Sequence, residues 1–125
     1  MKQEFRKQAI LLRKELDLKN ISLEICQKIC GMPEFLTAKD IGIFYPKEIE
    51  INLLPLSETD KNFYLPKVVN TSMEFYKFTN ENDLKIGAFG ILEPVSEKIN
   101  KNLDIIFTPA LMADKRGFRL GWGGG

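Results

Sequence analysis

The stretch IGIFYP, Ile41–Pro46, is short, rich in β-branched and aromatic residues, and ended by proline. This composition is typical of a buried strand. Stretches of the same kind follow along the chain: NFYLPKVV from Asn62, MEFYKF from Met73 and LDIIFTPA from Leu103. Residues 49–56, between the first two, could form a crossover helix whose end is disturbed by Pro55. Because MEFYKF alternates poorly, its partner strand and its buried face stay open.

Helical patterns precede the first strand. Apolar residues at helical spacing predict an amphipathic helix from Lys2 to about Leu16, on Phe5, Ala9, Leu12 and Leu16. A second helix is predicted up to about Cys30, with Asn20 or Ser22 as N-cap and Gly31 as a left-handed C-cap. Pro33 suits the first turn of a short third helix. Strands that alternate with helices favour an α/β fold with helices on the faces of the sheet.

Length and charge limit the class of protein. A chain of 125 residues fits one domain, residues 1–125, and no apolar run approaches the roughly 20 residues that span a bilayer. The N-terminus mixes acids with bases and lacks a signal pattern, so we expect a cytoplasmic protein without a membrane partner. The net charge of +1 offers no global field for nucleic acid. Without any histidine, Cys26 and Cys30 are predicted to be buried apolar residues and not zinc ligands.

Prolines mark the ends of three predicted strands, at Pro46, Pro66 and Pro109. In open α/β sheets, ligands bind beyond the carboxyl ends of the strands. The prolines could simply terminate the strands, but three of them together favour a shaped rim around a binding site.

Two groups of polar residues are candidates for that site. Lys2 and Arg6 lie four residues apart, with Arg13 further along the same helical ridge, and form either a solvated basic face or a phosphate clamp. Glu48 follows the first strand in a loop. Its carboxylate could accept hydrogen bonds from an N–H-rich ligand such as a pterin, or it could be a surface acid.

Glycines crowd the stretch RGFRLGWGGG, Arg116–Gly125, which holds five of the nine in the chain. Glycine lets backbone N–H groups approach a phosphate closely, and Arg119 would add a forked cation. A flexible linker has a similar composition. The spacing fits neither the Walker pattern nor the Rossmann fingerprint.

Taken together, these segments resemble the 5-formyltetrahydrofolate cyclo-ligase family. The matching segments are KQEFR, IFYPKEIEI, FYLPKV, MEFYKF, GAFGILEP, LDIIFTPALMAD and DKRGFRLGWGGG. The last is the most specific, since Asp114 is followed at fixed spacing by glycine, by Arg-Leu-Gly and by the glycine-rich stretch. The resemblance implies a three-layer α/β/α sandwich with a mostly parallel, Rossmann-like sheet and N-terminal helices, akin to sugar-phosphate isomerases and CoA transferases.

The resemblance also implies an activity. The family uses ATP with Mg²⁺ to convert 5-formyltetrahydrofolate into 5,10-methenyltetrahydrofolate, releasing ADP and phosphate. ATP phosphorylates the formyl oxygen, N10 attacks the activated carbon, and phosphate leaves. Such a reaction depends on orientation and charge neutralisation more than on groups that exchange protons.

Site residues follow from the motif match. The implied ATP-binding residues are Lys2, Arg6, Arg119, Leu120, Gly121, Trp122, Gly123, Gly124 and Gly125. Of all the site residues, Arg119 alone is a candidate for a catalytic role. The implied folate-binding residues are Glu48 and Trp122, with Tyr45, Met73 and Phe75 as contacts that could equally belong to the core.

The match stops at Gly125, where the family continues into a Tyr-Tyr-Asp segment. We therefore expect a chain that lacks the family's C-terminal segment, with the metal-binding Asp beyond Gly125 and no metal ligand present. The sheet is then expected to keep an unpaired edge, compatible with a monomer or a weak dimer.

Two other readings compete with this one. A non-catalytic module that binds folate or a nucleotide would show saturable binding without ADP release. A different enzyme of the same sheet class, such as a sugar-phosphate isomerase or a CoA transferase, would need a positioned base or a carboxylate nucleophile.

Overall fold

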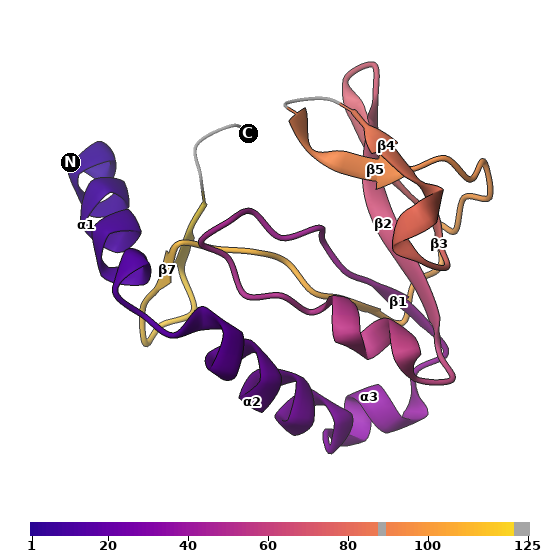
Figure 1. The fold of residues 1–125 in the computed structure, drawn as a ribbon, viewed down its shortest axis with the longest axis horizontal. Coiled ribbons are helices and arrows are strands. Elements are labelled where there is room, and N and C mark those ends of the chain that lie inside the picture. Colours follow the sequence, from indigo (N-terminus) through magenta and orange to yellow (C-terminus); the bar gives the residue numbers. More distant parts are fainter. Residues whose placement is uncertain (88–89, 122–125) are drawn as a thin grey trace.

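The computed structural model describes residues 1–87 and 90–121. Three α-helices come first in the chain. Figure 1 shows them along one side of the molecule, with the strands of the central sheet beside them. The helices are α1 (Lys2–Lys14), α2 (Leu18–Cys30) and α3 (Pro33–Thr37), with 3-10 helices η1 (Leu54–Glu58) and η2 (Glu81–Asp83). The strands are β1 (Asp40–Gly42), β2 (Asn62–Val69), β3 (Ser72–Phe78), β4 (Leu84–Ile86), β5 (Leu92–Pro94), β6 (Ile105–Ile106), β7 (Met112–Ala113) and β8 (Arg119–Leu120).

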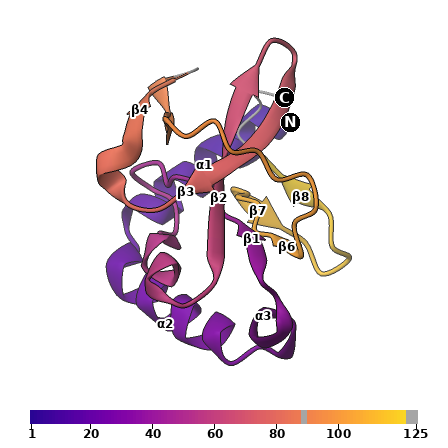
Figure 2. The same cartoon turned by 90° about the vertical axis from the view of Figure 1, so that its right-hand side faces the viewer.

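The central sheet has the order β3-β2-β1-β6. β1 pairs in parallel with β2 and with β6, whereas β3 returns antiparallel along the full length of β2. The short hairpins β4–β5 and β7–β8 form separate two-stranded sheets, and Figure 2 shows them on opposite sides of the central sheet. The expected α/β fold with a mostly parallel sheet and N-terminal helices is confirmed.

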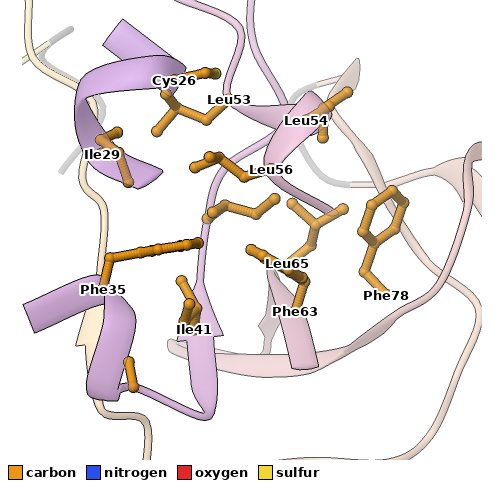
Figure 3. Packing of buried hydrophobic residues seen from close by; sticks show 12 residues of the cluster. Cys26, Ile29, Phe35, Ile41, Leu53, Leu54, Leu56, Phe63, Leu65 and Phe78 are labelled. Carbon is orange, nitrogen blue, oxygen red and sulfur yellow. The ribbon is translucent and has the colours of Figure 1, made fainter. Parts of the chain in front are cut away.

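One face of the sheet forms the hydrophobic core. Side chains from the sheet meet side chains from α2, α3 and η1, as Figure 3 shows, with Leu56 of η1 pointing between them. The largest of these residues are almost fully buried: Ile41, Ile43, Leu56, Phe63 and Leu65. Alternation within the strands explains the set, because Ile41 and Ile43 of the β1 segment share a face.

The opposite face carries a different set of side chains. Gly42 of β1 lies beneath the Phe75 ring and Leu103, since a Cβ added to Gly42 would stand only 2.9 Å and 3.0 Å from their atoms. Val68 and Met73, which are paired across β2 and β3, are exposed. The question left open for MEFYKF is thereby settled: β3 pairs with β2, buries Tyr76 and Phe78, and turns Met73 and Phe75 to this second face.

The structure corrects four predictions about local structure. Asp17 caps α2 by accepting from the Asn20 backbone, so neither Asn20 nor Ser22 is the cap. Gly31 ends α2 with φ −95°, not in the left-handed region, because an ordinary turn back to Ile29 and Lys28 suffices there. The predicted crossover helix over residues 49–56 is the 3-10 helix η1, in whose first turn Pro55 is tolerated.

The fourth correction concerns Pro66, which lies inside β2 and not at its end. β1 pairs with β2 only as far as Tyr64, so beyond that point a residue without an N–H group interrupts no bond to β1.

The first helix also differs from its sequence pattern. Phe5, Leu12 and Leu16 are exposed, and Ala9 alone of the predicted stripe is buried. α1 instead presents Arg6 and Arg13, which lie on the same side as Ala9, to the rest of the protein. The prediction that both cysteines are buried is confirmed for Cys26 and wrong for Cys30, which is exposed.

Candidate functional site

α1 meets the last described residues of the chain through Arg6. Its Nε atom donates a hydrogen bond of 3.1 Å to the carbonyl oxygen of Gly121, 115 residues away in sequence. Lys2 lies one turn earlier on the same helix and is exposed. The structure therefore brings Arg6 to the start of the predicted phosphate loop, although the two residues are far apart in sequence.

The hairpin β7–β8 holds Arg119 next to this junction. The turn is fixed by Asp114, whose Oδ1 accepts from the backbone N–H groups of Arg116 at 2.8 Å and Phe118 at 3.0 Å. Gly117 has φ +91°, a conformation that only glycine adopts without strain. Arg119 follows in β8, is exposed, and donates to the Pro109 carbonyl at 3.3 Å. The order of Asp, Gly and Arg in the sequence thus has a local structural reason.

Arg13 plays a different part from the one its sequence position indicated. It is half-buried, and its guanidinium donates to the Ile49 carbonyl at 3.2 Å, the Ala110 carbonyl at 2.7 Å and the Leu111 carbonyl at 3.0 Å. The solvated basic face is therefore wrong for Arg13.

The loop after β1 contains the candidate acid Glu48, which is exposed in a turn. Two residues later, Glu50 is only 7% exposed, and its Oε1 accepts from the Lys47 backbone N–H at 2.7 Å. The Glu50 N–H in turn donates to the Lys47 carbonyl at 2.9 Å. Sequence reasoning missed Glu50. The sequence feature that could have indicated it is an acid between two isoleucines, Ile49 and Ile51. Glu50 is three residues after Lys47, at a spacing where a carboxylate can accept a hydrogen bond from the backbone of its own turn.

A cavity of about 260 Å³ opens where β1 and β6 end. Its walls come from α2, the loop after β1 and the segment after β6, and Arg13 and Glu50 are its charged residues. The cavity lies at the carboxyl ends of parallel strands, the position that the α/β sheet predicts for ligands.

A second cavity of about 330 Å³ lies on the face of the sheet opposite the core. It contains Met73 and Phe75, two of the predicted folate contacts, together with Leu103 and Ile106. Lys101 and Glu74 stand 3.9 Å apart at its margin, with the Lys101 side chain 76% exposed. Asn100 adds a further polar group, so the lining is mixed, and a mixed lining suits an aromatic ligand that carries polar groups.

The remaining predicted residues are distributed as follows. Tyr45 is half-buried and packs against the core cluster, and Leu120 and Gly121 are half-buried in and after β8. Trp122, Gly123, Gly124 and Gly125 lie outside the described residues.

Four groups in the sheet and α2 have shifted pKa values. Burial raises the pKa of the Cys26 thiol, with a smaller contribution from Cys30. Burial likewise raises the pKa of Tyr64, and burial and Glu74 raise the pKa of Tyr76. Hydrogen bonds from the backbone N–H groups of Asp40 and Lys39 lower the pKa of Asp104. The Asp104 bonds of 2.8 Å and 2.9 Å fasten the start of β6 to β1.

The described residues do not provide a protein-built metal site. Within residues 1–87 and 90–121, no group of three or more His, Cys, Asp and Glu side chains could hold an ion. Nor is any helix in this part of the chain long and apolar enough to cross a membrane.

The fold defines an α/β protein with a cavity at the carboxyl ends of its parallel strands, the position where α/β enzymes bind ligands. The model of the 5-formyltetrahydrofolate cyclo-ligase family matches residues 2–125, and the chain belongs to this family.

Individual relatives agree with this assignment. A 5-formyltetrahydrofolate cyclo-ligase of Haemophilus influenzae is 32% identical over 112 residues, covering 81% of this chain and 60% of the relative. The chain thus spans 60% of the length of that curated relative.

Solved structures share the fold. The NMR structure of 5,10-methenyltetrahydrofolate synthetase from Aquifex aeolicus superposes with a TM-score of 0.86 at 31% identity, covering 99% of this chain and 68% of that one. The Mycoplasma pneumoniae 5,10-methenyltetrahydrofolate synthetase, 19% identical, has a TM-score of 0.71 over 98% of this chain and 71% of its own, which supports the fold alone.

Proposed function

We propose that the protein catalyses the ATP-dependent cyclisation of 5-formyltetrahydrofolate to 5,10-methenyltetrahydrofolate, with release of ADP and phosphate. Family membership supports the reaction class. The observation that carries the proposal to this chain is the bond from Arg6 to Gly121, which joins α1 to the residue that follows β8. Gly121 is two residues from Arg119, and this nearness supports a shared role for the two arginines.

In the proposed mechanism, Lys2, Arg6 and Arg119 hold the phosphates of ATP. Arginine carries five N–H donors in a fork that fits phosphate oxygens. Arg6 uses Nε for Gly121, and its terminal nitrogens supply the donors proposed for phosphate. The backbone of Leu120 and Gly121 is proposed to contribute N–H groups beside these cations, and the motif match adds Trp122 and Gly123–Gly125, which lie outside the described residues. ATP is proposed to enter as its Mg²⁺ complex, so that the metal arrives with the substrate.

The chemistry needs no protein group to accept a proton. The formyl oxygen displaces ADP at the γ-phosphorus, the substrate N10 attacks the activated formyl carbon, and the C–O bond breaks to release inorganic phosphate, which takes the proton that N10 loses. Arg119 is proposed to neutralise the charge on the transferring phosphoryl group. Orientation of the two substrates is the protein's main contribution.

For the folate, Glu48 is proposed to accept hydrogen bonds from the pterin N–H groups. Met73 and Phe75 offer apolar contact in the cavity that they line. For Trp122, which lies outside the described residues, the motif match alone supports a contact with both substrates. Tyr45, which packs against the core cluster, is proposed to approach the folate only with its exposed part.

We further infer a cytoplasmic monomer or weak dimer that binds neither nucleic acid nor membranes. The balanced charge of +1 and the two free cysteines support this inference.

The test follows methenyl absorbance and ADP release after 5-formyltetrahydrofolate and MgATP are added to the chain. We expect turnover that Arg119→Met reduces at least about a hundredfold and that Glu48→Gln weakens mainly through a raised KM for folate. Arg116→Met, at an exposed residue of the same hairpin, is the control. Saturable binding of both ligands without ADP release would instead indicate a binding module. Loss of all chemistry in Glu48→Gln with unchanged folate affinity would favour an enzyme that uses this acid chemically.

A further inference from the structure

Arg13 connects three parts of the protein that are far apart in sequence. It lies in the last turn of α1, and its guanidinium bonds to Ile49 in the loop after β1 and to Ala110 and Leu111 after β6. These contacts cross 36, 97 and 98 residues of sequence. A half-buried guanidinium with carbonyl acceptors on two segments fixes the distance between those segments.

Each of the two segments leads directly to a predicted substrate contact. Ile49 is the neighbour of Glu48, the proposed folate acid. Leu111 begins the hairpin, where its N–H group donates to the Leu120 carbonyl at 2.8 Å, and Leu120 is the neighbour of Arg119. Arg13 thus bonds to the neighbour of Glu48, and through Leu111 and Leu120 it is connected to the neighbour of Arg119. In the described structure it makes no hydrogen bond to the side chain of Glu48 or Arg119.

Glu50 restrains the turn that carries Glu48. Its carboxylate closes the turn by accepting from the Lys47 N–H at 2.7 Å, and its own N–H bonds back to Lys47. Glu50 and Arg13 line the same cavity of about 260 Å³. The turn that presents Glu48 is thus closed by Glu50 and held in place by Arg13.

We propose that Arg13 is a positioning residue that sets the Glu48 turn and the Arg119 hairpin in a fixed relation, and so aligns the folate with the nucleotide. The inference rests on the proposed function. Phosphoryl transfer to the formyl oxygen joins the two substrates at a single atom, so a small shift between their binding elements lowers the rate steeply. Lysine cannot replace Arg13, because one ammonium cannot reproduce a planar fork that bonds to Ile49 on one side and to Ala110 and Leu111 on the other.

A purely architectural role is the alternative, in which Arg13 only fastens α1. The first experiment compares Arg13→Lys with Arg116→Lys, which makes the same exchange at an exposed arginine of the hairpin. Amide hydrogen exchange is measured at Glu50 and Leu111, with Ile43, whose N–H donates to the Tyr64 carbonyl at 2.9 Å, as the core reference. We expect about tenfold faster exchange at Glu50 and Leu111 together in Arg13→Lys, with Ile43 unchanged. Unchanged exchange at either site would overturn the proposal.

The second experiment asks whether Arg13 acts through Glu48. Dissociation constants for 5-formyltetrahydrofolate are measured for the wild type, Arg13→Lys, Glu48→Gln and the double variant, at a temperature at which all four proteins are folded. We expect Arg13→Lys to weaken folate binding by about fivefold or more in the wild-type background and by less than about twofold in the Glu48→Gln background. Equal losses in the two backgrounds would indicate an architectural role and contradict the proposal.

The two experiments separate this inference from the proposed function. A wild-type chain that bound folate and turned it over, but showed additive losses, would refute the role of Arg13 alone. A wild-type chain that bound no folate would refute the proposed function and, with it, the ligand part of the role of Arg13. The exchange measurement would then still decide whether Arg13 joins the turn to the hairpin.

Discussion

Replacing Gly42 with alanine tests how the second face of the sheet is packed. Gly42 is the last residue of β1, and a Cβ there would stand 2.9 Å and 3.1 Å from two atoms of the Phe75 ring and 3.0 Å from a methyl of Leu103. Contacts this short force the ring or the leucine to move. Phe75 also lines the cavity proposed for folate, so the change reaches from strand packing to ligand binding.

Two effects of opposite sign determine the magnitude. Gly→Ala at a compatible backbone stabilises by about 0.4–1 kcal/mol, because it restricts the unfolded chain. The backbone of Gly42 is compatible with alanine, because its φ is not positive; in the described chain only Gly90 and Gly117 are glycines with positive φ. Overpacking a close contact costs about 1–3 kcal/mol. We therefore expect Gly42→Ala to lower the free energy of unfolding by roughly 0–2.6 kcal/mol, the overpacking cost less the gain from the restricted unfolded chain.

The assay is urea unfolding followed by circular dichroism, with Gly31→Ala as the matched control. A Cβ at Gly31 would meet only the Lys28 carbonyl, at 3.7 Å, so the control should gain about 0.4–1 kcal/mol. In a Phe75→Leu background, the cost of Gly42→Ala should shrink because the nearest ring atom is gone. If Gly42→Ala is as stabilising as Gly31→Ala, the packing argument is refuted.

Three further predictions concern stability and reactivity. Leu56→Ala, at a residue 1% exposed, should cost about 2–5 kcal/mol in urea unfolding, and a cost below about 1 kcal/mol would contradict the core assignment. Because the pKa of Asp104 is lowered in the folded state by bonds from the backbone of Asp40 and its neighbour, Asp104 contributes stability above the unfolded pKa of about 3.9 and loses it as the pH falls through the lower folded value. The stability gap between the wild type and Asp104→Asn should therefore be largest near neutral pH and narrow below about pH 4; a gap that is constant with pH would refute this. A thiol reagent at pH 8 should label exposed Cys30 quickly and buried Cys26, whose pKa burial raises, only after unfolding; equal native rates would contradict the burial of Cys26.

The sequence predicted those parts of the fold that depend on local pattern. β2 follows NFYLPKVV residue for residue, because its β-branched and aromatic residues suit a pleated surface wherever it lies. α3 begins at Pro33 as expected. The position of Pro66 could not be predicted in this way, since a proline is tolerated or excluded according to which neighbouring strand reaches it. Strand pairing is a property of distant segments that no local window contains.

The candidate site was predicted as a set of residue types but not as an arrangement. Lys2, Arg6, Glu48 and Arg119 could be named from motifs, and their roles stay predictions. Glu50 was missed because its partner is the backbone of its own turn, and a buried acid in a turn looks in sequence like a surface acid. The same limit applies to Phe75, whose orientation depends on the absence of a side chain at Gly42.

The arginines of α1 illustrate why helical spacing alone cannot assign function. Arg6 and Arg13 are seven residues apart and lie on the same side of the helix, so periodicity treats them alike. Both are half-buried, and their partners separate them: Arg13 meets backbone carbonyls on two segments, whereas Arg6 donates through Nε to Gly121 in the glycine-rich stretch. A guanidinium whose two terminal nitrogens bond to carbonyls is suited to hold protein segments together. One that is fixed through Nε keeps its terminal fork for other acceptors, which is the role proposed for Arg6. The proposed division between holding and binding thus follows from what the rest of the chain places opposite each residue, and the helix supplies only the common axis.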